Sequence, residues 1–279
     1  MTIKIQSLMT KQLKITQNDP YLAPFEPAIV GRHNYAVARE KELLGETNKT
    51  LSDFASGYMF FGLFKVKRSW VLREWAPNAT AIYLIGDFND WQKNEKFRLE
   101  SKENGVWELK ISEKYIHHGD LYKLIVEWNG GAGERIPAWC RRVVQDEKTK
   151  IFSAQVWQPE QEYKFRIRKF HPTKAPLMIY ECHIGMAAED EKVGTYNEFR
   201  ENILPRIAQA GYNCIQIMAI QEHPYYGSFG YHVSSFFAAS SRFGTPEELK
   251  RLIDEAHKLG IAVIMDIVHS HAVKNELEG

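Results

Sequence analysis

Four polar side chains that could do chemistry follow one short apolar run. The run GIAVIM ends at Asp266, and His269, Ser270 and His271 come soon after it. Where strands alternate with helices, functional side chains gather at the carboxyl ends of the strands. Three interpretations are open. A His-x-His pair with an aspartate could bind a divalent metal, the same groups could hydrogen-bond sugar hydroxyls, or they could only satisfy neighbouring backbone groups.

A second candidate site is the connection between the apolar run 214–220 and a helix that begins near residue 246. It is more than twenty residues long, whereas ordinary connections of this kind have about 2–6 residues and much longer ones tend to be functional. We expect most of its aromatic side chains, particularly Phe236 and Phe237, to pack within the loop. Tyr231 is the one that we expect to line a ligand site. The aromatic set is Tyr225, Tyr226, Phe229, Tyr231, Phe236 and Phe237.

The elements that must position these groups follow a strand–helix alternation from residue 176 onward. Runs 177–180, 214–220 and 261–265 predict three buried parallel strands covered by helices. Thr195 with Glu198 forms one capping box and Thr245 with Glu248 another, each opening a helix. Pro205 is expected to cost a hydrogen bond or to kink the first helix.

Residues 58–160 have a different period. Short runs at 70–75, 81–85, 106–111 and 121–127 alternate or fill with strand-forming residues, and turn signals separate them. This spacing predicts a β-sandwich. Trp75 and Trp91 lie in turns, where a tryptophan is often partly exposed, whereas Trp107 lies in an alternating strand and is expected in the core. Residues 1–57 are predicted to be helical, with helices over 35–44 and 51–55.

The composition excludes several classes of protein. The chain has 279 residues, a formal net charge of +1 and 25% charged residues, which gives no reason to expect a nucleic acid or a membrane as partner. No apolar run reaches the ~20 residues of a membrane span, and the N-terminus does not have the form of a signal peptide. The three cysteines are scattered, which favours a reduced, cytoplasmic compartment. No phosphate loop or Ser–His–Asp arrangement stands out.

An ordered set of motifs resembles the glycogen and starch branching enzymes of the α-amylase superfamily, closest to the eukaryotic type. YECHIGM at 180–186, EHPYYGSFGYHV at 222–233, SRFGTPEELKRLIDEAHKLGI at 241–261 and DIVHSHAVKN at 266–275 match its barrel, WAPNA at 75–79 and GDFNDW at 86–91 match its CBM48-type sandwich, and RIPAW at 135–139 with RRVVQD at 141–146 matches the connecting segment. The resemblance implies a helical segment over 1–57, an immunoglobulin-like CBM48 sandwich over 58–160, and the first three βα units of a TIM barrel, an incomplete catalytic domain, over 161–279.

The resemblance also implies site residues and favours the sugar interpretation over metal. At the active site, Asp266 supports the cluster, His271 contacts the sugar at the cleavage point and Tyr231 stacks on that sugar. No metal and no cofactor are implied. A second, glucan-binding groove between the helical segment and the sandwich is implied at the following positions: Asn48, Trp75, Pro77, Trp91, Glu103, Asn104, Gly105 and Val106.

The implied activity is the cleavage of an α-1,4-glucan and transfer of the segment to a sugar 6-hydroxyl. The implied partners are α-1,4-glucans such as glycogen, amylose and maltooligosaccharides. The nucleophilic aspartate and the acid/base glutamate of this family fall after Gly279, so none of the catalytic residues lies in these 279 residues, and we expect the chain alone to be inactive. The alternatives are a non-catalytic glucan-binding protein, a metal-dependent barrel hydrolase that uses His269 and His271, and a debranching or trehalose-forming relative.

Overall fold

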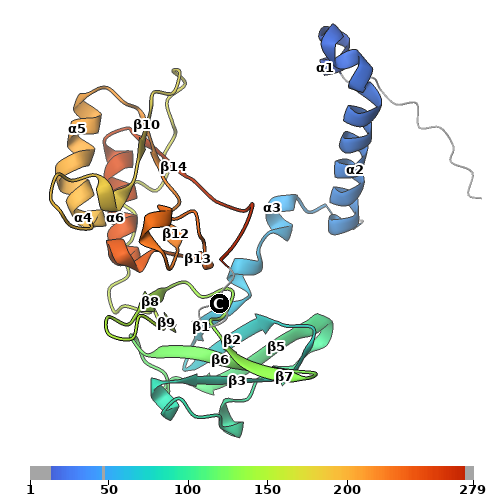
Figure 1. The fold of residues 1–279 in the computed structure, drawn as a ribbon, viewed down its shortest axis with the longest axis vertical. Helices are drawn as coiled ribbons and strands as arrows, with labels where there is room; N and C mark the ends of the chain where they lie inside the picture. Colours follow the sequence, from blue (N-terminus) through green and yellow to red (C-terminus); the bar gives the residue numbers. More distant parts are fainter. Residues whose placement is uncertain (1–13, 46–47, 274–279) are drawn as a thin grey trace, which may run out of the picture. The chain divides into compact units, whose positions relative to one another are not determined.

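The structure is a computed structural model that describes residues 14–45 and 48–273 (Figure 1). The chain divides into two compact units, one up to Gly57 and one from Tyr58 onward. Thirteen residues of the predicted helical segment, 1–13, lie outside the described residues, as do Glu46, Thr47 and the end of the last matched motif. Among the described residues, no helix is long and apolar enough to cross a membrane.

The first unit is helical, as the sequence predicts. It contains α1 (Lys14–Asn18), a 3-10 turn (Pro20–Phe25), α2 (Glu26–Leu44) and α3 (Leu51–Phe54). Helix α2 begins nine residues earlier than the pattern predicts, after the turn that the Asp19 side chain caps at the amide of Tyr21. It ends at Gly45, where φ is +60°. Helix α3 begins with a capping box between Thr50 and Asp53.

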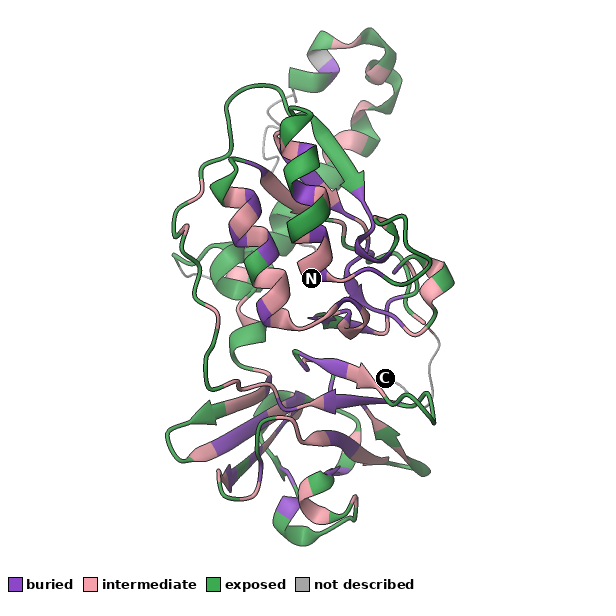
Figure 2. Ribbon diagram, turned by 90° about the vertical axis from the view of Figure 1, so that its left-hand side faces the viewer, coloured by how far each residue is buried: buried purple, intermediate pink, exposed green. Residues whose placement is uncertain are grey.

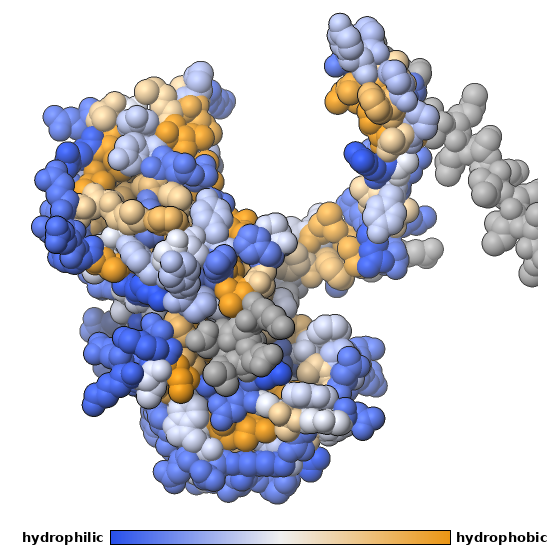
Figure 3. Space-filling view, viewed as in Figure 1, coloured by the Kyte–Doolittle hydropathy of each residue, from blue (hydrophilic) through white to orange (hydrophobic). Residues whose placement is uncertain are grey.

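A sandwich of two antiparallel sheets begins the second unit. One sheet has the order β1 (Gly62–Val66), β2 (Ser69–Trp75), β5 (Val106–Ser112) and β4 (Glu100–Ser101). The other has β3 (Ala79–Gly86), β6 (Leu121–Trp128), β9 (Phe152–Gln155) and β8 (Val143–Gln145), and β7 (Gly131–Arg135) pairs with β6. All four predicted runs are strands. Trp107 is buried in the core between the sheets, as predicted, and the face seen in Figure 3 is mostly hydrophilic.

A three-stranded parallel sheet of order β10–β11–β14 forms the rest of the second unit. Its strands are β10 (Ile179–Cys182), β11 (Cys214–Ile217) and β14 (Ala262–Met265), and its helices are α4 (Tyr196–Glu198), α5 (Leu204–Gln209) and α6 (Pro246–Lys258). Both predicted capping boxes are present. The buried residues of α6 are Glu247, Leu252, Asp254 and Ala256, and Figure 2 colours each residue of the fold by its burial. Pro205 stands in the first turn of α5, directly after a π-helical stretch over Phe199–Ile203, so the predicted irregularity is confirmed.

Short elements connect these strands and helices. Strands β12 (Gln221–Glu222) and β13 (Ser235–Ala239) pair with each other inside the long connection. The remaining 3-10 turns of the described residues are Gly57–Met59, Asp87–Asn89, Glu95–Phe97, Glu103–Gly105, Ile184–Met186, Tyr226–Ser228 and Ser241–Phe243.

The prediction of a buried strand over 177–180 is wrong. The strand begins two residues later, and the side chains of Leu177, Met178, Ile179 and Tyr180 are 37–53% exposed. Apolar runs predict burial because a parallel sheet is normally covered on both faces. Strands β10 and β14 are instead the two edges of a three-stranded sheet, so each has a neighbouring strand on one side only. The predicted burial of the run 261–265 is therefore also wrong for β14, whose side chains are half-buried or exposed.

Candidate functional site

The carboxyl end of β14 carries the polar cluster that the sequence singles out. The Tyr231 hydroxyl donates a hydrogen bond to Asp266 Oδ2 at 3.0 Å, and His271 Nε2 lies 2.7 Å from the carbonyl oxygen of Tyr231. The backbone amide of Asp266 donates to the carbonyl of Ile217 at the end of β11. We call Tyr231, Asp266, Ser270 and His271 the strand-end cluster. The structure therefore brings together the three predicted active-site residues from two segments.

Hydrogen bonding orients both the tyrosine and the histidine. The bond to Asp266, followed by burial, raises the pKa of Tyr231, so the hydroxyl stays protonated and keeps donating. In neutral His271 the proton must be on Nε2 if this atom donates to the carbonyl, and Nδ1 then accepts from the Ser270 hydroxyl at 2.9 Å. Both ring nitrogens of His271 are thus engaged.

This geometry does not form a metal site. His269 points toward Phe236, with ring centroids 6.0 Å apart, and His271 has no ring nitrogen left for a metal. Within residues 14–45 and 48–273, no group of three or more His, Cys, Asp or Glu side chains is arranged to hold a metal ion. What the cluster keeps for a ligand is the second carboxylate oxygen of Asp266 and the lone pairs of the Tyr231 and Ser270 hydroxyls, which suit a hydroxyl-rich ligand.

Gly230 places Tyr231 at the cluster. Its φ is +91°, and a Cβ there would lie 1.8 Å from the carbonyl oxygen of Ala219. The loop can approach β11 this closely only because the residue has no side chain. Next to it, Val233 and Val268 pack with Ala219 in a small core, against which the ring of Tyr231 rests.

A buried carboxylate that the sequence analysis missed holds the rest of the loop. Glu222 is 1% exposed and accepts hydrogen bonds from the Ser240 and Ser241 hydroxyls, the amide of Ser241 and the amide of His223. Burial is the main cause that raises the pKa of Glu222, and these hydrogen bonds oppose it. A glutamate among apolar and aromatic residues is the one signal that could have indicated this role, because a buried carboxylate must be hydrogen-bonded.

Most of the predicted groove residues of the sandwich meet at one end of β2 and β5. Trp75 pairs with Val106, its ring is 57% exposed, and its Nε1 donates to the carbonyl of Asn104 at 3.0 Å. A Cβ on Gly105 would lie 2.8 Å from Pro77, so these two backbones are in close contact. Glu103 and Val106 also line an open hollow of about 730 Å³.

Trp91 and Asn48 lie apart from this group. Trp91 follows the far end of β3, and its Nε1 donates to Asp87 at 3.0 Å. Trp75 precedes the near end, so the two tryptophans flank an eight-residue strand that is roughly 23 Å long at about 3.3 Å per residue. Asn48 belongs to the other compact unit, just ahead of α3. The roles of both residues remain predictions.

The two phenylalanines predicted to pack within the loop do not bury their rings there. Phe236 is 36% exposed and Phe237 is 45% exposed. The Phe237 ring stacks on Trp139, which lies in the segment after β7, with ring centroids 4.1 Å apart. Phe237 therefore packs across to the sandwich side of the unit, a long-range contact that local sequence patterns do not predict.

Comparison with known proteins gives a match for each part of the second unit. Residues 61–140 match the family model of carbohydrate-binding module 48 (isoamylase N-terminal domain), and residues 190–277 match that of the alpha amylase catalytic domain. Among solved structures, the catalytic module of the glycogen-degrading pneumococcal virulence factor SpuA matches 86% of this chain at a TM-score of 0.66 and 18% identity, with 41% of that chain covered. A putative alpha amylase from Salmonella typhimurium matches 78% of this chain at a TM-score of 0.61 and 20% identity, with 35% of that chain covered. These structural similarities show that the chain shares the fold of the matched regions of these proteins.

Curated relatives match over nearly the whole chain. The 1,4-alpha-glucan-branching enzyme of Dictyostelium discoideum is 43% identical over 98% of this chain and 41% of its own length. That of Rhizophagus irregularis is 45% identical over 95% of this chain and 39% of its own length. That of Arabidopsis thaliana, form 2-2, is 43% identical over 95% of this chain and 34% of its own length. The chain thus spans 34–41% of the length of these relatives. By sequence and fold, it is a homologue of the 1,4-alpha-glucan-branching enzymes, with a module 48 sandwich followed by part of an alpha-amylase-type catalytic barrel.

Proposed function

We propose that the chain is the glucan-binding part of a 1,4-α-glucan branching enzyme, which cleaves an α-1,4-glucan and transfers the segment to a sugar 6-hydroxyl. The observation that carries the proposal is the strand-end cluster. The homology supports it, since the matched relatives are named as branching enzymes. In this proposal the ligands are α-1,4-glucans, and the cytoplasm is the compartment.

Tyr231, Asp266 and His271 each have a task in binding the sugar at the cleavage point. The Tyr231 ring supplies an apolar face for the sugar, and its bond to Asp266 fixes the angle of that face. Asp266 keeps a second carboxylate oxygen for a sugar hydroxyl. His271 is tied to the backbone of Tyr231, so the imidazole and the ring move together. These groups bind and orient the sugar, and none of them attacks it.

We predict that the purified 279-residue chain does not branch amylose. A retaining glycoside transfer requires two carboxyl groups about 5–5.5 Å apart, and Asp266 is engaged with Tyr231 as a positioning group. Three parallel strands also do not close a barrel. The measurement is the appearance of α-1,6 linkages in amylose after incubation, with a full-length branching enzyme as the positive control. New α-1,6 linkages above the blank would contradict the prediction.

The sandwich is proposed to bind glucan on its own through the groove at Trp75. We expect Trp75→Ala to weaken maltoheptaose binding at this groove about fivefold, since an aromatic contact of this kind is worth about 1 kcal/mol. The ring is 57% exposed, so its removal leaves the core intact. Calorimetric titration measures the affinity, and Phe165→Ala, which removes a partly exposed aromatic ring that does not line the hollow beside Trp75, serves as a control. If the affinity of Trp75→Ala for maltoheptaose is unchanged, Trp75 does not contribute to glucan binding at the groove.

The same titration on Trp91→Ala decides whether the groove extends along β3. A loss of affinity would place both tryptophans on one bound glucan, and an unchanged affinity would restrict the groove to the Trp75 end. Binding without branching in these experiments would also fit the non-catalytic glucan-binding alternative.

A further inference from the structure

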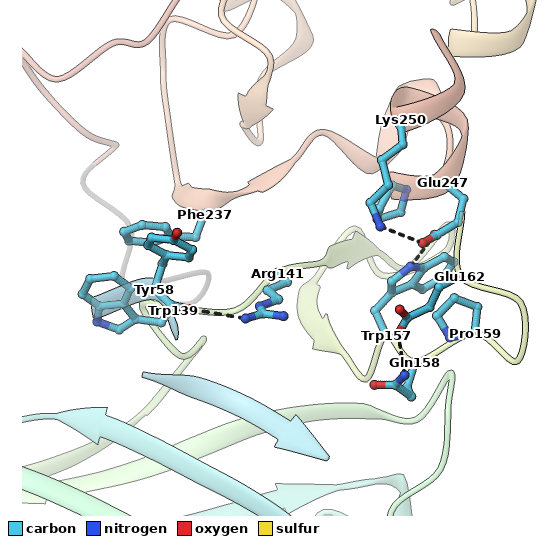
Figure 4. Close-up of a pocket in the computed structure, with 11 residues that line it drawn as sticks. Tyr58, Trp139, Arg141, Trp157, Gln158, Pro159, Glu162, Phe237, Glu247 and Lys250 are labelled. Atoms are coloured by element: carbon cyan, nitrogen blue, oxygen red, sulfur yellow. Dashed lines mark hydrogen bonds and ion pairs between the residues drawn. The ribbon is translucent and has the colours of Figure 1, made fainter. Parts of the chain in front are cut away.

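A cavity of about 510 Å³ lies within the second unit, between the sandwich strands and the parallel-sheet region (Figure 4). Its walls come from Tyr58 ahead of β1, from the segments after β7 and β9, from β13 and from the start of α6. Its volume falls within the ~300–1,000 Å³ that is usual for small-molecule sites. We call it the junction pocket. It is separate from the strand-end cluster and from the groove at Trp75, with which it shares no lining residue.

Exposed aromatic rings form one side of the junction pocket. Figure 4 shows Tyr58, Trp139 and Phe237 gathered there, and Arg141 lies between them and the opposite side. Trp139 is held between two rings, since it stacks on Phe237 at 4.1 Å and on Phe61 at 5.3 Å. Tyr58 is 53% exposed, and its hydroxyl has no hydrogen-bond partner among the described residues. The two stacked neighbours cover the faces of Trp139 and fix its position, so the exposed rings of Tyr58 and Phe237 are the ones that offer an apolar face, and Tyr58 adds one unused hydroxyl.

Fixed polar groups form the opposite side. The carboxylate of Glu247 accepts from Trp157 Nε1 at 2.6 Å and from Lys250 Nζ at 3.1 Å, and it is buried. The Gln158 amide donates to Glu162 at 2.6 Å. The ammonium of Lys250 carries three N–H groups and the Gln158 amide carries two, so both keep donors for a ligand. The pocket is therefore rich in oriented hydrogen-bonding groups.

The charges on the walls balance. Arg141 and Lys250 bring two positive charges, and Glu162 and Glu247 bring two negative charges. An excess of positive charge on the walls would favour a phosphate or another anion, and an excess of negative charge would favour a cation. A neutral ligand fits this balance. Flat apolar faces for stacking, together with dispersed donors and acceptors, are what a neutral, hydroxyl-rich pyranose ring requires.

We propose that the junction pocket binds a short segment of α-1,4-glucan, as a second site on the same unit as the groove at Trp75. The identity of the ligand rests on the proposed function, whereas the shape, charge balance and aromatic faces of the pocket do not. A glucan bound there touches Phe237 and Lys250 from the parallel-sheet region and Trp139 and Trp157 from the segments that leave the sandwich. Binding therefore also stabilises the contact between these two regions.

The test is calorimetric titration of the 279-residue chain with maltoheptaose in four forms: the parent chain, Trp75→Ala, Phe237→Ala and the double variant. We expect two sites in the parent chain, the groove weakened about fivefold in Trp75→Ala and the junction pocket weakened about fivefold or more in Phe237→Ala. In the Trp75→Ala background, Phe237→Ala is expected to weaken the remaining binding about fivefold or more. The matched control is Phe165→Ala, which removes another partly exposed phenylalanine, one that does not line the pocket, and should change nothing.

A second variant protects the test against misfolding. Lys250→Met keeps the length of the side chain but removes the ammonium, and it should weaken the same site without changing the Phe237–Trp139 stack. The proposal is overturned if Phe237→Ala and Lys250→Met both bind as their Trp75→Ala parent does. If the parent chain has a single site and Trp75→Ala weakens it, the groove at Trp75 is supported and the proposal for the junction pocket is wrong. If the parent chain binds no maltoheptaose, the proposed function itself fails.

Discussion

Replacing Asp254 by alanine is expected to lower the free energy of unfolding of the second unit by about 3 kcal/mol. The change removes a buried carboxylate and leaves the groups that donate hydrogen bonds to it without an acceptor. Asp254 lies on α6 and is fully buried. Its carboxylate accepts from the hydroxyl of Tyr163, from the backbone amides of Arg166 and Ile167, and from Arg166 Nε. One side chain thus fastens the segment after β9 to the helix.

The shifted pKa of the Asp254 carboxyl group is expected to make the stability of the second unit depend on pH. Burial by itself would raise the pKa of Asp254, but the hydrogen bonds from Tyr163, Ile167 and Arg166 outweigh it and hold the pKa well below its usual value. In the unfolded chain the pKa is about 3.9. A lowered pKa in the folded state means that the stabilisation is complete above this value and is lost as the pH falls below about 4.

Urea denaturation at pH 7 and at pH 3 measures both effects. Asp254→Asn keeps the volume of the side chain and removes the charge, so its difference from the parent chain should shrink at the lower pH. Glu255→Gln is the control, because Glu255 binds the same Arg166 and Lys258 near the surface and should cost less than about 1 kcal/mol. Equal losses of stability in Asp254→Ala and Glu255→Gln would contradict the role assigned to Asp254.

Gly230→Ala is expected to cost about 2–5 kcal/mol of stability or to displace the loop that carries Tyr231. Two penalties add. An L residue at a positive φ costs about 1–2 kcal/mol, and a Cβ placed 1.8 Å from the Ala219 carbonyl oxygen adds an overpacking cost of about 1–3 kcal/mol. Because the neighbouring atom belongs to the backbone, no side chain can move aside to relieve the contact.

The chain offers a matched control for this prediction. Gly211 has a similar φ, +86°, but no atom lies within 4 Å of a Cβ there. Gly211→Ala should therefore carry only the conformational penalty of about 1–2 kcal/mol. Thermal or urea denaturation of both variants gives the difference. If Gly230→Ala is no less stable than Gly211→Ala, the loop does not depend on the close approach to Ala219.

Much of the fold could be predicted from local patterns. The capping boxes at Thr195 and Thr245, the interruption at Pro205 and the alternating strands of the sandwich lie where the sequence places them. Each of these features depends on neighbours within a few residues, so composition and spacing are sufficient. The buried strand predicted over 177–180 was wrong because burial depends on what covers a strand, which its own residues do not encode.

For the candidate site, the residue types at the end of one strand were visible in the sequence, but their arrangement was not. The hydrogen bond from Tyr231 to Asp266 joins residues 35 positions apart, and that from Tyr163 to Asp254 joins residues 91 apart. Such contacts arise only when the chain is packed, because burial removes water and leaves each polar group to find a protein partner.

By itself, the sequence determined the two architectures of the second unit, the positions of Tyr231, Asp266 and His271 along the chain, and the resemblance to branching enzymes. Only the tertiary structure decided that His271 has both nitrogens engaged, that Trp75 and Trp91 stand at opposite ends of β3, and that Trp139 and Phe237 face a common pocket. The physical reason is the distance along the chain over which each kind of interaction acts. Periodicity and capping are local properties, whereas a binding site is a set of distances between segments that only packing brings together.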